Sequence, residues 1–207
     1  MKISQTLLTG LISLLALGSG TSAMAQSPSG IFLEPGITYE LGDHTVNWPS
    51  PLSDSTGTTR GLGAALRAGF HLNESFFLGL DARYGMPTFK NSASNYDATA
   101  KAYNYGPVLG FQMPDMGLRI WGAYVLDGEL NPEASGNYDV NLKKAMGPRV
   151  GLGFHVQSFS LNVEYEQVKY GESVLEQAGP FTPGYVFNGV NLENKAWILS
   201  ASFPIEF

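Results

Sequence analysis

Apolar and polar residues alternate with a period of two along most of the chain after residue 30. This alternation is typical of β-strands that bury one face and leave the other polar. In the first such segment, Ile31, Leu33 and Ile37 share one face, while Glu34 and Glu40 share the other. Eight segments repeat the pattern, and we expect one strand in each: 31–41, 61–72, 76–86, 103–113, 118–127, 145–156, 159–166 and 194–207.

The connections between these segments alternate in length. Three are tight turns, at 73–75, 114–117 and 157–158. Four are long and are expected to be loops, at 43–59, 87–100, 128–142 and 171–192. Short turns at one rim and long loops at the other are typical of transmembrane barrels. Since no linker or low-complexity tract interrupts the pattern, we expect one domain.

The N-terminus has the organisation of a secretory signal peptide. Lys2 is followed by a mostly apolar stretch at 7–17 and then by Ala23-Met24-Ala25, a small-x-small cleavage site. We therefore expect residues 1–25 to be a cleaved signal peptide and residues 26–207 to be the mature barrel.

The amino-acid composition argues against several classes of protein. Charged residues make up 14% of the chain, against roughly 25% in ordinary soluble domains. The absence of Cys excludes a disulfide scaffold and Cys-ligated metal sites. A net charge of −6 argues against a nucleic-acid partner, which would need a surplus of Lys and Arg. No motif indicates a cofactor or a metal, so we expect none.

Two features indicate that the apolar face points outward. The lumen of an eight-stranded barrel is just wide enough for side chains to fill it, and the apolar face is too bulky for that space. Aromatic residues of this face are also sorted by height, as at the two interfaces of a bilayer. Phe lies near the tight turns, at 70, 76, 111, 154, 159, 203 and 207, whereas Tyr and Trp lie toward the long connections, at 39, 84, 103, 105, 124, 165 and 197. The expected fold class is therefore all-β, an eight-stranded antiparallel up-and-down transmembrane β-barrel, with a lipocalin-like soluble barrel as the alternative.

Eight strands, a signal peptide and the terminal alternation Phe203-x-Ile205-x-Phe207 resemble the OmpA/OmpX-type outer-membrane β-barrel family. The resemblance implies a location in the bacterial outer membrane, in contact with its lipid and lipopolysaccharide. It also implies that Phe203, Ile205 and Phe207 form the signal read by the barrel-assembly machinery. Because the sequence stops at Phe207, we expect the barrel alone, without the periplasmic peptidoglycan-binding domain of longer members.

Charged residues on the other face are expected to form a salt-bridge network in the lumen. A three-residue turn at 73–75 would place Arg67 opposite Asp81, and a two-residue turn at 157–158 would place Arg149 opposite Glu166. Buried charges are costly unless they are paired, so pairing is expected. The expected network comprises Glu34, Arg67, Asp81, Arg83, Arg119, Arg149, Glu164 and Glu166, with Glu40 and Asp127 also pointing inward. It can be the packed core of the barrel or, alternatively, a gated pore or proton path.

Catalytic chemistry has little support in the sequence. His44 falls in the first long loop, and His71 and His155 lie beside tight turns, with no Ser within two residues on the same face. Asp43 and Asp54 accompany His44, but a lone His with acids in a loop is weak evidence for hydrolysis. We therefore expect no enzyme, with lipid modification as the least favoured alternative.

The long connections carry more acidic than basic residues, together with scattered apolar ones. Exposed aromatic residues on loops suit contact with another surface or a small apolar ligand. We therefore expect a structural and surface-interaction role through four long extracellular loops, with a narrow channel for small solutes or ions as the alternative. The apolar residues are Val46, Trp48, Leu52, Phe89, Tyr96, Tyr138, Val174, Phe181, Tyr185 and Phe187.

Overall fold

A computed structural model describes residues 30–92, 96–134, 138–156, 158–178, 184–186 and 189–207. The expected signal peptide, residues 1–25, lies outside these residues and stays a prediction. Within the described part of the chain, no helix is long and apolar enough to cross a membrane.

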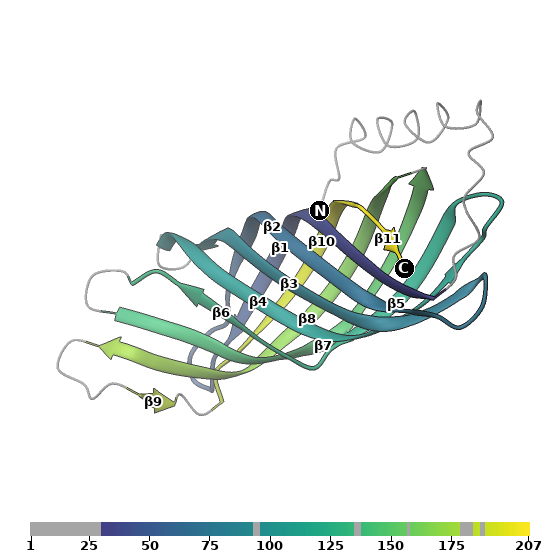
Figure 1. Ribbon diagram of the computed structural model, residues 1–207. Coiled ribbons are helices and arrows are strands. Elements are labelled where there is room, and N and C mark those ends of the chain that lie inside the picture. Colours follow the sequence, from purple (N-terminus) through teal and green to yellow (C-terminus); the bar gives the residue numbers. More distant parts are fainter. Residues whose placement is uncertain (1–29, 93–95, 135–137, 157, 179–183, 187–188) are drawn as a thin grey trace.

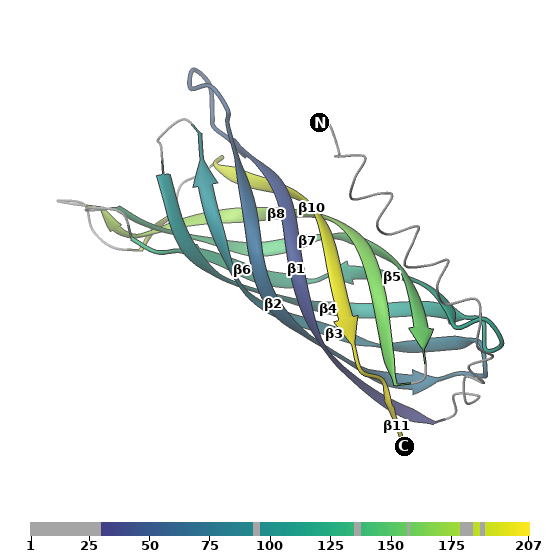
Figure 2. The same ribbon diagram turned by 90° about the horizontal axis from the view of Figure 1, so that it is seen from above.

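The described residues form one antiparallel sheet that closes on itself as an eight-membered ring (Figures 1 and 2). β5 and β6 together fill one place in the ring, β10 and β11 fill another, and the short β9 pairs with β8 outside it. Closure comes from β1, which pairs with β2 on one side and with β10 and β11 on the other. The strands are β1 (Ile31–Asn47), β2 (Ser55–His71), β3 (Phe76–Asn91), β4 (Tyr96–Gln112), β5 (Leu118–Val125), β6 (Asp127–Pro132), β7 (Tyr138–Val156), β8 (Phe159–Ala178), β9 (Tyr185–Val186), β10 (Asn191–Ser202) and β11 (Ile205–Glu206).

The tight turns set the register that the sequence predicts. Asn73 closes the β2–β3 turn, since its Oδ1 accepts the backbone N–H groups of Ser75 and Phe76, each at 2.8 Å. Arg67 consequently lies opposite Asp81 in the ladder. At the tight hairpin between β7 and β8, Arg149 lies opposite Glu166. Both predicted pairings are confirmed.

The apolar face points outward, as expected. Leu62 and Leu80 expose 68% and 65% of their surface on the outside of the barrel. Arg149, on the inside, is among the largest fully buried side chains. The soluble-barrel alternative would require the opposite arrangement, so the expected fold class is confirmed.

The strands are longer than predicted, and the connections between them are shorter than the expected loops. β1 runs to Asn47 and β2 begins at Ser55, so only 48–54 separate them, where 43–59 was expected to be a loop. β7 and β8 pair as far out as Tyr138 and Ala178. The ladders continue where the outward residues become polar, and the pattern of outward apolar residues therefore ends before the strands do.

The fifth segment contains a break that changes which face points inward. Val125 is buried in the lumen, Leu126 is exposed, and Gly128 and Leu130 are again buried. One residue is therefore added to the alternation between β5 and β6. Asp127 consequently lies opposite Tyr105, which faces outward, so the prediction that Asp127 points into the lumen was wrong.

Candidate functional site: a charged belt in the lumen

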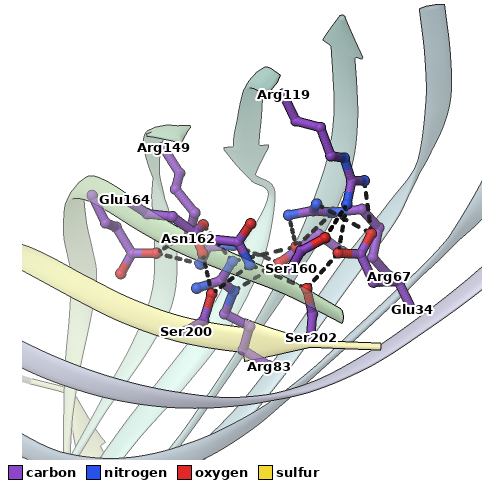
Figure 3. A network of polar contacts seen from close by, with 12 residues as sticks. Glu34, Arg67, Arg83, Arg119, Arg149, Ser160, Asn162, Glu164, Ser200 and Ser202 are labelled. Carbon is purple, nitrogen blue, oxygen red and sulfur yellow. Dashed lines mark hydrogen bonds and ion pairs between the residues drawn. The ribbon is translucent and has the colours of Figure 1, made fainter. Parts of the chain in front are cut away.

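Charged residues from β1, β2, β3, β5, β7 and β8 form a belt around the middle of the lumen (Figure 3). No member of this belt exposes more than 8% of its side chain. The belt consists of the eight residues expected from the sequence: Glu34, Arg67, Asp81, Arg83, Arg119, Arg149, Glu164 and Glu166.

Asp81 of β3 is the centre of the belt, because three guanidinium groups converge on its carboxylate. Arg67 Nη2 lies 3.0 Å from Oδ2, while Arg83 Nε and Arg149 Nη1 lie 2.9 and 2.6 Å from Oδ1. A planar guanidinium can serve two carboxylates at once. Each of these Arg residues also contacts a second acid, so the ion pairs connect into one network.

Arg149 is the most completely paired cation of the belt. Its Nε donates to Glu166 Oε2 at 2.7 Å, and its Nη2 donates to the same oxygen and to Asn104 Oδ1, the latter at 2.8 Å. With the bond from Nη1 to Asp81, every nitrogen of the guanidinium has an acceptor. Burial of this charge is therefore matched by hydrogen bonds.

Glu34 and Glu164 are two further carboxylates of the belt that accept hydrogen bonds from arginines. Arg119 donates to both oxygens of Glu34, at 2.9 and 2.8 Å, and Arg83 donates to Glu164 at 2.6 Å. Neutral residues complete these contacts, and Figure 3 shows them between the charged groups. Ser202 donates to Glu34, Ser200 donates to Glu164, and Asn162 donates to both hydroxyls.

These neutral partners were not predicted from the sequence. Asn162 of β8 and Ser200 and Ser202 of β10 occupy inward positions of strands whose charged residues were already assigned. The only sequence feature that could have indicated these partners was the presence of small polar residues on the inward face. They lie on neighbouring strands, with Ser200 directly opposite Asn162 and Ser202 opposite Gly36. No tight turn joins these strands, so their register could not be read from the sequence.

An aromatic layer closes the lumen on the side of the tight turns. Phe32, Phe77, Val108 and Trp121 form one buried cluster there. The Arg67 guanidinium lies 4.7 Å from the centre of the Trp121 ring, and that of Arg119 lies 5.1 Å from the centre of the Phe77 ring. The belt therefore rests on this layer through cation–π contacts as well as packing.

A second apolar layer fills the lumen at the opposite end. Val46 and Phe89 belong to it and lie in strands, so the prediction that these two residues lie on loops was wrong. They are inward residues of β1 and β3 and are 7% and 6% exposed. The upper layer comprises Val46, Phe89, Ala100, Val125, Leu130, Leu142, Ala145, Val168, Tyr170, Val190 and Leu192.

The sequence suggested that His44 lies in a loop. In the structure it lies against this upper layer instead. Its ring stacks on Phe89 with 4.2 Å between ring centres, and its Nδ1 lies 3.1 Å from Thr59 Oγ1. Burial lowers the pKa of His44 to about 4, although the nearby Asp43 acts in the opposite direction. Asp54 is engaged elsewhere, as it accepts the backbone N–H of Trp48. The structure therefore makes His44 a packing residue.

Small cavities lie between the two apolar layers. One, of about 40 Å³, is lined by Glu40, Arg83, Asn104, Arg149 and Glu166, among others. A second, of about 10 Å³, lies beside Glu34 and Glu164. Cavities of this size hold one to a few water molecules. Along β1, the inward residues pass from Phe32 through the belt to Val46, so each cavity has an apolar layer above and below it.

The remaining histidines lie at the rim formed by the tight turns. His155 has no Ser within two residues on its own strand, but the ladder places Ser160 of β8 opposite it, and His155 Nδ1 lies 3.0 Å from Ser160 Oγ. Ser160 is fully buried and also accepts a hydrogen bond from Arg119. His71 Nε2 lies 3.3 Å from Glu206 Oε1. Among the described residues, no group of three or more His, Cys, Asp or Glu side chains could hold a metal ion.

The terminal residues expected to form the assembly signal face outward. Phe203, Ile205 and Phe207 are all exposed. The backbone N–H groups of Phe203 and Phe207 donate to Pro35 and Ile31 of β1, so this segment completes the closure of the barrel. Recognition by the assembly machinery stays a prediction.

Known proteins share this architecture. The attachment invasion locus protein Ail of Yersinia pestis is 13% identical, with a TM-score of 0.50 over 85% of this chain and 99% of Ail. AlkL, solved in lipid bilayers, is 13% identical, with a TM-score of 0.51 over 88% of this chain and 93% of AlkL. Neisserial surface protein A is 14% identical, with a TM-score of 0.49 over 88% of this chain and all of that protein. At these identities the similarity concerns the fold.

Sequence comparison identifies the family. None of the curated proteins matches the chain. The family model of the outer membrane protein beta-barrel domain matches residues 12–203, which is most of the sequence. The chain therefore belongs to the outer membrane protein beta-barrel domain family and is a protein of the bacterial outer membrane.

Proposed function

We propose that the protein is a closed barrel that carries a rigid contact surface above the outer membrane, and that it does not conduct solutes. The observation that carries this proposal is the layering of the lumen. An aromatic layer, a charged belt whose members are all in ion pairs and an upper apolar layer follow one another along the barrel axis. A conducting path would have to cross both apolar layers.

The turn between β1 and β2 supports a role in surface contact. Trp48 and Leu52 expose 37% and 61% of their surface at this tip. The backbone is held in place, because Trp48 N–H donates to Asp54 and Leu52 N–H donates to Pro49 O, both at 3.1 Å. Apolar side chains on an ordered turn lose little conformational entropy on binding. The tip is therefore suited to contact with an apolar partner surface.

The structure of Ail gives this role a precedent. Ail is an attachment invasion locus protein, and it was crystallised with the heparin analogue sucrose octasulfate. A barrel of this fold can thus present a binding surface. The similarity concerns the fold alone, so the nature of the partner has to be tested on this protein directly.

Catalysis is not part of the proposal. His155 and Ser160 form the one His–Ser pair that the contacts of the described residues indicate, and Ser160 is 0% exposed. A nucleophile needs access to its substrate as well as a nearby base. We therefore assign this pair to packing of the rim.

Conductance measurements test the closed lumen. The refolded protein should give no stable single-channel steps in a planar bilayer, since two apolar layers block the lumen. Phe77→Ala should serve as a comparison, because it removes a fully buried ring from the aromatic layer. Stable steps in the unchanged protein that vanish on altering Arg67 would contradict the proposal and favour the channel alternative.

Adhesion measurements test the contact surface. Cells displaying Trp48→Ser/Leu52→Ser should bind apolar-coated beads several-fold less than cells displaying the unchanged protein at the same surface density. Lys90→Gln is the matched control, because Lys90 is exposed on β3 and lies outside the tip. Heparin-coated beads form a separate arm. Equal binding by all variants would remove the tip from the proposal.

A further inference from the structure

Glu40 of β1 differs from the other carboxylates of the lumen, because no cationic side chain of the described residues lies within ion-pair distance of it. Its Oε1 accepts one hydrogen bond, from Asn194 Nδ2 at 2.9 Å. The four carboxylates of the belt each contact one or more guanidinium groups instead. Arg83 and Arg149 line the same cavity as Glu40, but their ion pairs are with acids of the belt.

The lumen between the two apolar layers therefore contains an excess of negative charge. Five carboxylates and four guanidinium groups point into it, so one negative charge has no positive counterpart. A buried charge without a partner is costly, and one positive ion beside Glu40 would balance the lumen. The carboxylates are those of Glu34, Glu40, Asp81, Glu164 and Glu166, and the guanidinium groups are those of Arg67, Arg83, Arg119 and Arg149.

Asn194 of β10, the partner of Glu40, is a second sign of a missing positive group. Its side chain is buried, at 3% exposure, and its Oδ1 has no hydrogen-bond partner among the described residues. Buried polar atoms without a partner are rare in folded proteins. The amide cannot be turned over to satisfy this oxygen, because Oδ1 would then meet the acceptor Oε1 of Glu40. A group that attracts oxygen is therefore needed beside Oδ1.

Gly42 of β1 leaves open the space that these two oxygens border. A Cβ atom at position 42 would lie 2.7 Å from Asn194 Oδ1, 3.0 Å from Glu40 Oε1 and 3.2 Å from the carbonyl oxygen of Thr59. The three atoms nearest to this point are thus all oxygens. Carboxylate, amide and backbone carbonyl oxygens are the ligands that hard metal cations take in proteins. A cation can contact all three oxygens, whereas a proton joins only two.

The cavity beside Glu40 can provide the remaining ligands. It has a volume of about 40 Å³, which is room for one to a few water molecules. Arg83 Nη1 lines the same cavity and has no acceptor among the described residues, so a water there has a donor on one side and Glu40 on the other. This volume suits a small metal ion with some of its water and is too small for an organic cation.

We propose that Glu40, Asn194 and the carbonyl oxygen of Thr59 bind one monovalent metal cation, Na⁺ or K⁺, beside Gly42. Its single positive charge would cancel the excess negative charge of the lumen. The two ions share the same oxygen chemistry, so separate arms of the experiment distinguish them. The inference goes beyond the proposed contact surface and does not depend on it.

The dependence of stability on the cation tests the proposal. The protein is refolded in non-ionic detergent and unfolded with urea at about pH 8, where an ordinary glutamate is ionised. NaCl or KCl replaces choline chloride stepwise at constant ionic strength. Once the site is saturated, each tenfold rise in the bound cation should raise the ratio of folded to unfolded protein about tenfold. This dependence should be absent in Glu40→Gln.

Matched variants separate this site from other effects of salt. Asp97→Asn removes an exposed carboxylate, 53% of whose side-chain surface is accessible, and should keep the full dependence. Gly42→Ala keeps Glu40 but adds a methyl group next to the three oxygens, and should weaken the dependence. In choline chloride alone, Glu40→Gln should be at least as stable as the unchanged protein, because it has no unmatched charge. Resistance to unfolding on unheated gels verifies that each variant is folded.

Three results would overturn the proposal. Equal stability of the unchanged protein in choline chloride and in both metal chlorides would show that no metal cation binds. If its stability also fell with rising pH while that of Glu40→Gln did not, the charge of Glu40 would be neutralised by a proton instead. An equal response of Glu40→Gln and the unchanged protein to Na⁺ or K⁺ would place the effect outside the lumen.

Discussion

The lower and upper parts of this barrel are built from the same strands but have opposite interiors. On β1, inward Glu34 belongs to the charged belt, whereas inward Val46 belongs to the upper apolar layer. The outward-facing residues change in the opposite direction, from apolar ones such as Leu62 in the lower part to charged ones such as Lys90 in the upper part. The medium outside the wall explains the change. Lipid requires apolar residues outside and leaves the polar ones to the lumen, whereas above the membrane water surrounds the wall and the lumen becomes an ordinary core.

The two interiors are therefore stabilised by different forces. The belt is stable only as a set, because removing one partner leaves a buried charge without compensation. The upper layer consists of packed apolar side chains, and the loss of one leaves a cavity whose cost depends on how far the surroundings relax. Substitutions in each region should distinguish these two modes.

The largest effect is expected in the belt. Arg149→Ala should lower the free energy of unfolding by roughly 3–5 kcal/mol, because Glu166 and Asp81 both lose a guanidinium partner. The measurement is the urea midpoint of the protein refolded in detergent. Lys90→Ala removes an exposed ion pair with Asp97 and should cost less than about 1 kcal/mol.

A double variant separates pairing from simple loss of volume in the belt. Arg149→Gln/Glu166→Gln removes both charges and should be less destabilised than Arg149→Gln alone, since no unpaired carboxylate remains at position 166. Additive effects would show that the two side chains do not interact. They would also contradict the description of the belt as a connected set.

The upper layer should respond through packing. Leu130→Ala removes a side chain that is 1% exposed and should cost roughly 2–5 kcal/mol. Leu62→Ala, a matched change on the lipid-facing surface, should cost much less in the same detergent. Similar costs for the two changes would mean that the upper lumen is not a packed core.

A smaller, pH-dependent effect is expected at His44. The pKa of about 4 in the folded protein lies below the ordinary histidine pKa of 6.5, so folding favours the neutral ring. Its contribution is complete above about pH 6.5 and is lost progressively as the pH falls toward 4, up to ~3 kcal/mol in total. Unfolding midpoints at several pH values, for the protein and for His44→Gln, should show a steeper acid decline with His present. If the midpoints of the two proteins decline in parallel as the pH falls, the His44 ring is in contact with water in the folded protein.

Much of the membrane-spanning half could be predicted from the sequence. Strict alternation identified eight strands and the outward apolar face, and the tight turns gave the pairs Arg67–Asp81 and Arg149–Glu166. These are local properties, because a turn of known length fixes which residues face each other across a hairpin. To predict each pair, it was enough to assign the length of one turn correctly.

The upper half was harder to predict for a physical reason. Above the girdle the outward face is polar and the inward face apolar, so the pattern that identified the strands reverses at that point. Val46 and Phe89 were consequently assigned to loops, and His44 was assigned with them. Asp127 was misplaced because one extra residue between β5 and β6 reverses every following position.

The sequence by itself determined the barrel, its inside-out membrane half and the partners across tight hairpins, since period-two alternation and turn length act over a few residues. Only the tertiary structure decided the contacts across the lumen, such as Arg149 with Asp81, Arg83 with Glu164 and Arg119 with Glu34. It also decided that the upper lumen is a packed apolar core. These contacts join strands far apart in the chain, and closure of the ring sets their relative heights.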